Sequence, residues 1–527
     1  MNEVVVIGAG HNGLVCAFYL ASAGLKVTVL ESRDVVGGAA VTEGFHPGFR
    51  NSVASYTVSL LNPKIIADLD LARHGLKVVE RRAANFLPRE DGFLLTGEGR
   101  TKVSVARYSA RDAERLDAYD QRLEAIADVL RAVILQTPPN MIEGGLVHAI
   151  PELLKAAGLG RRLAKLDVTA RRDLLALFSQ SAGDWLDGWF ESDPIKAVLG
   201  FDGVVGNYAS PYTPGSAYVL LHHVFGEVNG KKGAWGHALG GMGAITQAMA
   251  AACREQGVEI RTGIGVREII TAKGRAVGVV TDAGEAIAAA TVVSNAHPKI
   301  TFERLIDPAL LPADFRERIG RYRSGSGTFR MNLALSEPPR FTCLPEVGDH
   351  LTAGIIVAPD LAYMDRAFMD ARRDGWSREP IVEMLIPSML DDSLAPPGRH
   401  VASLFCQHVA PTLPGDRSWD DHRDEVADLM IATVDRWAPG FKASVIGRQV
   451  KSPLDLERDF GLIGGDIFHG ALGLDQLFSA RPVLGSGAYR APVPGLYLCG
   501  AGTHPGGGVT GAPGHNAARE ILRDLRR

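Results

Sequence analysis

Three glycines near the start of the chain have the spacing of a phosphate-binding turn. Gly8 ends the apolar run "EVVVIG", and Gly10 and Gly13 follow it. Glu31 ends the next apolar run, "LKVTVLE". Glycines at this spacing permit a tight turn, let the backbone approach a pyrophosphate and allow a helix to pack closely on a strand. A carboxylate in the position of Glu31 accepts hydrogen bonds from a ribose 2′-hydroxyl. The pattern predicts a bound dinucleotide and leaves NAD and FAD open.

A second glycine turn follows at once, in the stretch "SRDVVGGAAVTEGF". It is close enough in sequence to reach the same pyrophosphate, and a domain that binds NAD alone has no need of it. This second turn therefore favours FAD. Besides the residues above, the predicted cofactor contacts of the two turns are His11, Asn12, Ser32, Gly37, Gly38, Ala39 and Ala40.

The stretch "GLYLCGAGTHPGGGVTGAPGHNAAREIL" near the C-terminus combines an apolar strand with further glycine turns and a helix. Pro513 suits the first position of a helix that runs to about Leu525. The N-terminus of a helix stabilises negative charge, which a reduced isoalloxazine ring gains at N1–C2=O. His504 lies inside this loop, so it is the candidate catalytic residue. The predicted cofactor contacts here are Gly500, Gly502, Gly508, Val509 and Thr510.

Periodicity indicates the elements that hold these loops. The residues from His11 onward have helical spacing, and Gly24 suits the end of that helix. The stretch "GGMGAITQAMAAACREQGVEIRTGIGVREI" leads from another glycine turn into a helix and two strands. The stretches "SGTFRMNLALSE" and "HVASLFCQHV" alternate apolar and polar residues, which predicts two half-buried strands.

Between residues 105 and 225 the chain is predicted to be mainly helical. The segment "LLKAAGLGRRLAKLDVTARRDLLALF" carries basic residues among its leucines. Two interpretations stay open for it. It could form a basic amphipathic surface that contacts lipid and passes an apolar substrate inward, or a helical cap with a solvated charged face.

Three quoted motifs carry a family resemblance. "VVVIGAGHNGLVCAFYLASAGLKVTVLE", "GGAAVTEGF" and "GLYLCGAGTHPGGGVTGAPG" resemble the phytoene desaturase-related FAD oxidoreductases. "WFESDPIKAVL", "SPYTPGSAYVLLHHVFG" and "DLERDFGLIGGDIFHGALGLDQLFSARP" resemble one branch of that family, which comprises pyridine nucleotide-disulfide oxidoreductase domain-containing protein 2 and its bacterial relatives. The resemblance extends over nearly the whole chain.

This resemblance implies an α/β fold with a Rossmann-like FAD-binding domain of the glutathione reductase or amine oxidase type. A substrate domain with a mixed β-sheet and a helical cap accompany it. We expect the FAD-binding domain to be discontinuous, with segments 1–80, 235–300 and 455–527. The helical cap and substrate-access region is expected at 105–225, and the substrate domain at 300–455. The resemblance also implies that the backbone around Val266 approaches the adenine end of FAD.

Composition excludes several classes of function. The chain of 527 residues has 56 basic and 60 acidic side chains, a net charge of −4, which gives no electrostatic argument for binding nucleic acid. Its five cysteines are far apart, odd in number and without a CxxC pair, so we expect free thiols and no disulfide chemistry. No HExxH or GxSxG motif predicts a metal site or an acyl-enzyme. We expect a cytoplasmic protein, with membrane contact and homodimer formation left open.

The leading functional hypothesis is an FAD-dependent oxidoreductase that dehydrogenates or isomerises C–C bonds of an elongated apolar substrate. Oxygen or a quinone is the expected electron acceptor, because no second strand-GxGxxG-helix unit is present to bind NADH or NADPH. Flavin amine oxidation is an alternative, for which Trp235 and Tyr489 could contribute to an aromatic cage. A flavin-bearing regulatory or scaffold protein with weak redox activity is a third.

Overall fold

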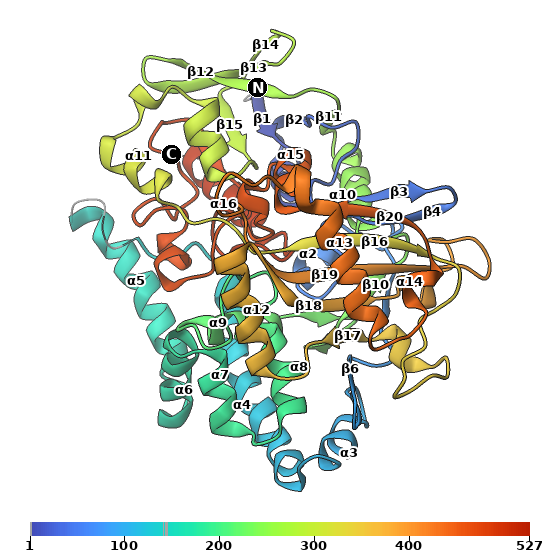
Figure 1. Cartoon of the computed structure of the whole chain (residues 1–527). Helices are drawn as coiled ribbons and strands as arrows, with labels where there is room; N and C mark the ends of the chain where they lie inside the picture. Colours follow the sequence, from blue (N-terminus) through green and yellow to red (C-terminus); the bar gives the residue numbers. More distant parts are fainter. Residues whose placement is uncertain (1–2, 141, 143–145, 527) are drawn as a thin grey trace.

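The computed structural model describes residues 3–526 except 141 and 143–145. A parallel β-sheet with its helices lies at the top of Figure 1, next to both chain ends, and a larger sheet lies beneath it. Helices from the segment between residues 101 and 224 gather on one side below the parallel sheet. This arrangement of a parallel sheet, a mixed sheet and a helical region agrees with the predicted α/β fold.

The parallel sheet has five strands in the order β11-β2-β1-β15-β21. Its strands are β1 (Glu3–Ile7), β2 (Lys26–Leu30), β11 (Glu259–Arg261), β15 (Thr291–Ser294) and β21 (Leu496–Leu498). All four pairings are parallel. The sheet thus takes strands from each of the three ranges expected for the FAD-binding domain, while the limits of the domains stay a prediction.

Three helices cover one face of this sheet: α1 (His11–Ser22), α10 (Gly243–Glu255) and α16 (Ala512–Leu525). Val4 and Val6 of β1 pack toward the core that contains these helices, whereas Val5 and Ile7 pack into a second core on the other side. That second core includes residues of β12 (Val266–Ala272) and β13 (Arg275–Thr281). A strand buried on both faces explains why the run "EVVVI" does not alternate.

The helices and strands predicted around the glycine turns are confirmed. The first helix ends at Ser22, just before Gly24, and the last helix has Pro513 in its first turn. The fold also brings two distant cysteines into one core, because Cys16 on α1 and Cys499 after β21 are both fully buried there. Both are free, and burial raises the pKa of Cys499 well above its usual value.

The larger sheet has seven strands in the order β20-β16-β19-β18-β17-β6-β7. They are β6 (Asn85–Arg89), β7 (Gly92–Leu95), β16 (Phe329–Leu335), β17 (Gly354–Val357), β18 (Trp376–Leu385), β19 (His400–Val409) and β20 (Val445–Lys451). Helices α12 (Leu361–Asp374) and α13 (Trp419–Asp435) pack against this sheet. The remaining strands of the chain are β3 (Thr42–His46), β4 (Phe49–Ser52), β5 (Val78–Glu80), β8 (Glu227–Val228), β9 (Lys231–Lys232), β10 (Gly236–Ala238) and β14 (Ala286–Ala288).

The prediction that β16 and β19 are half-buried is wrong. Every residue of β16 is buried, and so is every residue of β19 after His400. The polar residues of β16 face a second layer of protein and not solvent. Arg330 donates hydrogen bonds to the carbonyls of Ala54 and Leu404, and Asn332 donates to the carbonyl of Ser52. Alternating apolar and polar residues indicate that the two faces of a strand differ chemically. Here other parts of the protein cover both faces.

The helical region contains α3 (Thr101–Ala106), α4 (Ala110–Ile134), α5 (Leu146–Leu163), α6 (Val168–Ser179), α7 (Ala182–Trp189), α8 (Asp193–Val204) and α9 (Ser216–Val224). The other helices are α2 (Pro63–Asp68), α11 (Ala313–Gly320), α14 (Phe441–Ser444) and α15 (Pro453–Phe460). Within the described residues, no helix combines the length and apolar character needed to cross a membrane.

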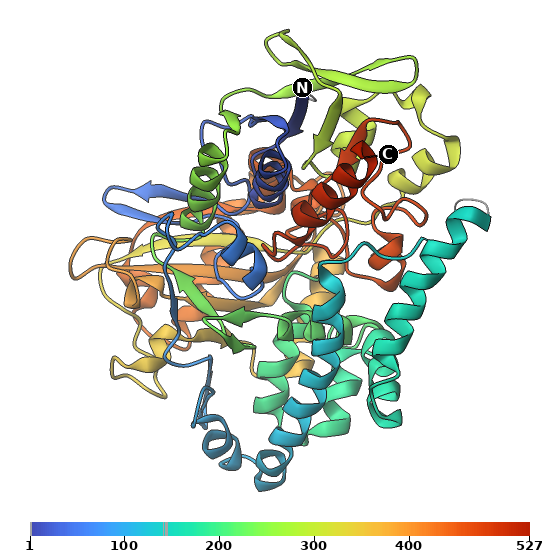
Figure 2. The same cartoon turned by 180° about the vertical axis from the view of Figure 1, so that it is seen from behind.

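Helices α1 and α16 lie side by side in a contact that tolerates only glycine (Figure 2). A Cβ on Gly514 would overlap the backbone carbonyl of Asn12. We expect Gly514→Ala to destabilise the protein by about 1–3 kcal/mol, despite the better helix propensity of alanine, because two helix backbones must separate. Thermal unfolding measures the change.

The matched control is Gly160→Ala on α5, where no atom lies within 4 Å of the new methyl group. This substitution should be neutral or stabilise the protein by up to about 1 kcal/mol, because alanine restricts the unfolded chain. Equal effects of the two substitutions on unfolding would show that the close α1–α16 contact does not determine the stability of the protein.

Candidate functional site

A long hollow runs along the carboxyl end of the parallel sheet. We call it the glycine trough, and residues from both glycine turns line it. Of the predicted cofactor residues, it brings together Gly8, Gly10, His11, Asn12, Glu31, Ser32, Gly38, Ala39 and Val266. In open α/β sheets, ligands bind outside the carboxyl ends of the strands, so the trough is the expected place for a nucleotide.

Other predicted glycines lie behind the wall of the trough, where backbone meets backbone. A Cβ on Gly13 would overlap the carbonyl oxygen of Gly8, and one on Gly500 would press against the carbonyl of Asn295. Gly37 and Gly502 are equally crowded, and Ala40 is fully buried beside Gly37. These positions hold the turns close together and do not face the hollow.

Glu31 is almost completely buried at the end of β2. One carboxylate oxygen accepts a hydrogen bond from the backbone N–H of Ala9 at 2.8 Å, and the other accepts from the N–H of Arg33 at 3.0 Å. These two bonds fix the carboxylate at the rim of the trough. A carboxylate can accept further hydrogen bonds, so Glu31 can still receive those of a ribose.

Several buried polar atoms in the trough lack a partner in the described part of the chain. They include Nε2 of His11, Oδ1 of Asn12 and Nδ1 of His469. Burial lowers the pKa of His11 to about 3 and that of His469 to about 4, so both rings are neutral at pH 7. Buried polar atoms without partners are rare in proteins and mark places where a ligand belongs. The trough therefore fits a polar, phosphate-bearing cofactor.

The trough continues into a second cavity, the inner pocket. His11, Ala39, His469 and Ala501 line both cavities, and Gly507, Gly508 and Val509 of the C-terminal loop line the inner pocket. No hydrogen bond within the described residues uses the backbone N–H groups of those three loop residues. Unpaired N–H groups beside a cavity fit the pyrimidine edge of an isoalloxazine ring, which carries hydrogen-bond acceptors.

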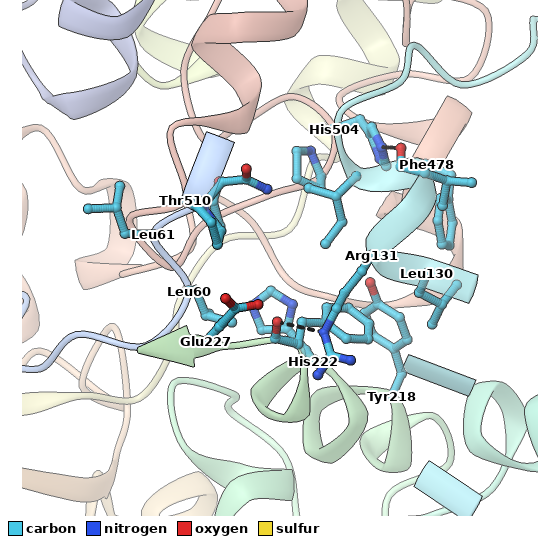
Figure 3. Close-up of a pocket in the computed structure, with 16 residues that line it drawn as sticks. Leu60, Leu61, Leu130, Arg131, Tyr218, His222, Glu227, Phe478, His504 and Thr510 are labelled. Carbon is cyan, nitrogen blue, oxygen red and sulfur yellow. Dashed lines mark hydrogen bonds between the residues drawn. The ribbon is translucent and has the colours of Figure 1, made fainter. Parts of the chain in front are cut away.

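His504, the candidate catalytic residue, lines a different cavity. This cap pocket, drawn in Figure 3, lies between the C-terminal loop and the cap helices α4 and α9. Nε2 of His504 donates a hydrogen bond to the carbonyl of Val133 at 3.4 Å, and burial lowers the pKa of the ring to about 4. Thr510 also lines the cap pocket. The catalytic role of His504 stays a prediction, and its observed contact is with α4.

The C-terminal loop and α16 are tied to the end of α4. Asn516 donates a hydrogen bond from Nδ2 to the carbonyl of Ile134 at 2.9 Å, and Arg519 donates from Nη1 to that of Leu135 at 3.1 Å. These side chains satisfy carbonyls at the end of the helix, and His504 adds a contact to the Val133 carbonyl, which also accepts from the backbone N–H of Gln136. Tyr489, one candidate for an aromatic cage, is fully buried and donates to the carbonyl of His504. Of the two cage candidates, Trp235 alone lines the inner pocket.

A third cavity, the outer groove, leads from the cap pocket to the surface of α5 and α6. Leu130, Val133, Phe478 and His504 line both the cap pocket and the outer groove. Leu60 in turn lines both the cap pocket and the inner pocket. The three cavities therefore adjoin one another from the loop of Gly508 to the protein surface. Apolar side chains dominate the lining of the outer two.

The inner pocket also contains ionisable residues that the sequence analysis missed. They are Tyr56, which follows β4; Arg81, which follows β5; Asp202 on α8; and Glu383 on β18. No spacing motif could have revealed them, because the fold assembles them from parts of the chain more than three hundred residues apart at the extremes. The described residues contain no group of three or more His, Cys, Asp or Glu side chains arranged to hold a metal ion.

Comparison with known proteins identifies the family. The family described as flavin containing amine oxidoreductase matches residues 13–522. The chain belongs to this family. The flavoprotein is 41% identical to rat pyridine nucleotide-disulfide oxidoreductase domain-containing protein 2, over 99% of this chain and 94% of the relative. It is 24% identical to a phytoene desaturase (lycopene-forming) from Pseudescherichia vulneris, over 100% of both chains.

Solved structures agree with this assignment at the level of the fold. Cyclohexylamine oxidase from Brevibacterium oxydans has a TM-score of 0.59 and 18% identity to the flavoprotein, with 100% of both chains covered. The resemblance to phytoene desaturase-related flavoproteins is thus confirmed, and so is the fold. The flavoprotein is an FAD-dependent oxidoreductase, and the third hypothesis, a scaffold protein, is set aside.

The crowded turn at Gly13 gives a direct test of the FAD site. In Gly13→Ala, the new methyl group overlaps the Gly8 carbonyl, so the turn must widen. We expect a loss of most of the bound flavin, measured as the ratio of flavin to protein absorbance after purification. Gly188→Ala on α7, where no atom crowds the new methyl group, should keep the normal ratio. Full flavin content in Gly13→Ala would place the cofactor elsewhere.

Proposed function

We propose that this flavoprotein dehydrogenates or isomerises C–C bonds of an elongated, largely apolar substrate. The single observation that carries the proposal is the series of adjoining cavities from the loop of Gly508 through the cap pocket to the outer groove. A series of this length suits a chain-like molecule better than a compact one. The likeness to a phytoene desaturase supports the same substrate class.

The proposed dehydrogenation removes one hydride and one proton from neighbouring carbon atoms and leaves a C=C bond. When bound, FAD would supply the acceptor for the hydride, water would take the proton, and oxygen or a quinone would be the final two-electron acceptor. Isomerisation needs no net acceptor. On this proposal Leu60 helps to orient the substrate, because it lines both the cap pocket and the inner pocket. The backbone N–H groups of Gly507 and Gly508 stabilise negative charge that develops on a group bound in the inner pocket.

The surface around the outer groove suits delivery of such a substrate from a membrane. Apolar side chains of α5 and α6 are largely exposed, with Leu154 at 63% and Leu175 at 70%. The same helices and their connection carry the exposed basic residues Arg161, Arg162, Lys165, Arg171 and Arg172. Exposed leucines beside basic side chains are typical of surfaces that bind anionic lipid. We therefore favour lipid contact over a purely solvated cap.

Amine oxidation is less well supported. Trp235 lines the inner pocket without Tyr489, and the pocket also holds the cationic side chain of Arg81, which would repel an ammonium group. The cyclohexylamine oxidase likeness concerns the fold and does not select an amine substrate for this chain.

Anaerobic reduction of the bound flavin tests the substrate class. We expect polyenes or long-chain apolar dehydrogenation substrates to bleach the flavin, whereas amines, NADH and NADPH should reduce it poorly. Leu60→Trp narrows the connection between the cap pocket and the inner pocket, so it should slow reduction by long substrates about tenfold or more. The control Met369→Trp, at an exposed position on α12 outside these three cavities, should react normally. Rapid bleaching by an amine, or by NADPH, would contradict the proposal.

Membrane contact has its own test. We expect the flavoprotein to co-sediment with vesicles that contain anionic phospholipid, and to do so less at high salt, because charge attraction contributes to binding. The double substitution Leu154→Asp and Leu175→Asp should release it from these vesicles while leaving its flavin content unchanged, since both side chains are exposed and distant in sequence from the glycine turns. Equal sedimentation of the variant would rule out α5 and α6 as the contact.

A further inference from the structure

The inner pocket contains an ionisable cluster that an entirely apolar substrate does not need. We call its four members, Tyr56, Arg81, Asp202 and Glu383, the charged cluster. Burying charges is costly unless they are paired, so a charged cluster inside a mostly apolar cavity requires a reason. The pairing within the cluster indicates which of its members is left for a ligand.

Arg81 is a half-buried cation with few partners. Its Nη2 donates a hydrogen bond to Thr57 Oγ1 at 2.6 Å, and its guanidinium lies 5.8 Å from the ring centre of Trp235. Burial lowers its pKa, while the nearby groups of Glu383, Tyr56 and Asp202 oppose that shift. Within the described residues, no carboxylate comes within 4 Å of its nitrogens. A guanidinium has five N–H donors, and only one side-chain hydrogen bond of Arg81 occurs within the described residues, so donors are left for a ligand.

Glu383 is held by other residues. It accepts a hydrogen bond from the Tyr56 hydroxyl at 2.5 Å, and the Tyr56 ring lies 4.5 Å from the guanidinium of Arg330. Arg330 is itself fixed by hydrogen bonds to Leu404 and Ser403. These contacts hold the Glu383 carboxylate on the sheet, where the charge of Arg81 lies near it without a direct hydrogen bond. Glu383 therefore balances the charge of the pocket without blocking the donors of Arg81.

Asp202 makes no side-chain hydrogen bond within the described part of the chain, and it lines the same pocket. Burial, and then the nearby charge of Glu383, raise its pKa to about 7, while Arg81 opposes the shift. Its other titratable neighbours are neutral: Tyr119, whose pKa burial raises, and His223, which burial holds at about 4. His223 donates from Nδ1 to the backbone carbonyl of Asp202. Below pH 7 the Asp202 carboxyl is thus increasingly available as a neutral hydrogen-bond donor.

We propose that the charged cluster is a subsite for the carboxylate head of an otherwise apolar substrate, with Arg81 as the principal ligand and Asp202 as a second donor. The inference rests on the proposed function, because the chain of such a molecule occupies the cap pocket and the outer groove. The guanidinium of Arg81 can donate two parallel hydrogen bonds to a carboxylate, which is its preferred geometry. The substrate class is then a long-chain or isoprenoid carboxylic acid.

An ammonium head fits the same pocket less well. It would lie beside the unpaired guanidinium, and the Glu383 carboxylate that could attract it is already bonded to Tyr56. A carboxylate instead accepts hydrogen bonds from the donors of Arg81 that have no acceptor within the described residues.

Binding of unreactive ligands to the purified holoenzyme tests the subsite. The probes are dodecanoate, dodecan-1-ol and dodecylamine, which share one chain and differ in the head group. Binding is read from the change in the absorption spectrum of the oxidised flavin and from the shift in unfolding temperature. We expect dodecanoate to bind about 10- to 100-fold more tightly than the alcohol, the range typical of a hydrogen bond to a charged group, and more tightly than the amine.

Two variants separate the head-group contact from a general loss of structure. Arg81→Met keeps much of the side-chain volume and should reduce the affinity for dodecanoate to that for the alcohol. Arg81→Lys keeps the positive charge but lacks the paired N–H donors of a guanidinium. It should recover part of the preference for dodecanoate over dodecan-1-ol. Flavin content and the affinity for dodecan-1-ol should stay unchanged in both, because these two measurements do not depend on the head-group contact.

The pH dependence provides a further readout. Dodecanoate has an ordinary pKa of roughly 4 to 5, so it stays ionised above about pH 6. As pH rises through the pKa of Asp202, the carboxyl becomes anionic and repels the ligand. Affinity should fall by up to about tenfold per unit above pH 7. Asp202→Asn should flatten this dependence and leave the affinity for the alcohol unchanged.

The outcomes distinguish the subsite from the proposed function. If all three probes bind equally and Arg81→Met changes none of them, the subsite is wrong while the apolar cavities stand. If dodecylamine binds best, the cluster binds cations and the inference is overturned. If no long-chain probe binds but propionate does so through Arg81, the subsite holds and the elongated substrate of the proposed function is wrong.

Discussion

The close approach of backbones at the first turn of α1 is the constraint on which the rest of the structure depends. Gly13 faces the Gly8 carbonyl on one side of this turn, and Gly514 faces the Asn12 carbonyl on another. Neither position has room for a methyl group. The end of β1, the start of α1 and the start of α16 are therefore fixed to one another as a single unit. Because of this, loops from opposite ends of the chain line one continuous hollow.

The sequence was sufficient to predict the elements whose chemistry is local. A glycine turn between an apolar strand and a helix can be read from a few consecutive residues, and β1, α1, β2 and α16 appear where the pattern placed them. Glu31 also lies at the predicted strand end. In these cases backbone conformation and burial depend on neighbours in the sequence, so periodicity and glycine spacing carry the information.

The remainder depends on contacts between distant segments. Arg330 and Asn332 looked like a solvent-facing row on β16, but the segment that contains Ser52 and Ala54 covers them and accepts their hydrogen bonds. Arg81 and Glu383 meet in one pocket although about three hundred residues separate them. A single sequence contains no pattern that predicts which distant residues line the same pocket. His504 shows the converse, because its place inside a glycine loop did not reveal that its side chain turns toward α4.

The hydrogen bonds between α4 and the C-terminal loop couple two parts of the molecule that perform different tasks. The last carbonyls of α4, from Val133 to Leu135, are bonded to His504, Asn516 and Arg519. Leu130 and Val133 of the same helix form part of the wall along which a substrate would travel. A molecule that pushes this helix aside must also pull on the loop that carries Gly508. The hydrogen bonds thus connect one wall of the cap pocket mechanically to the backbone that lines the inner pocket.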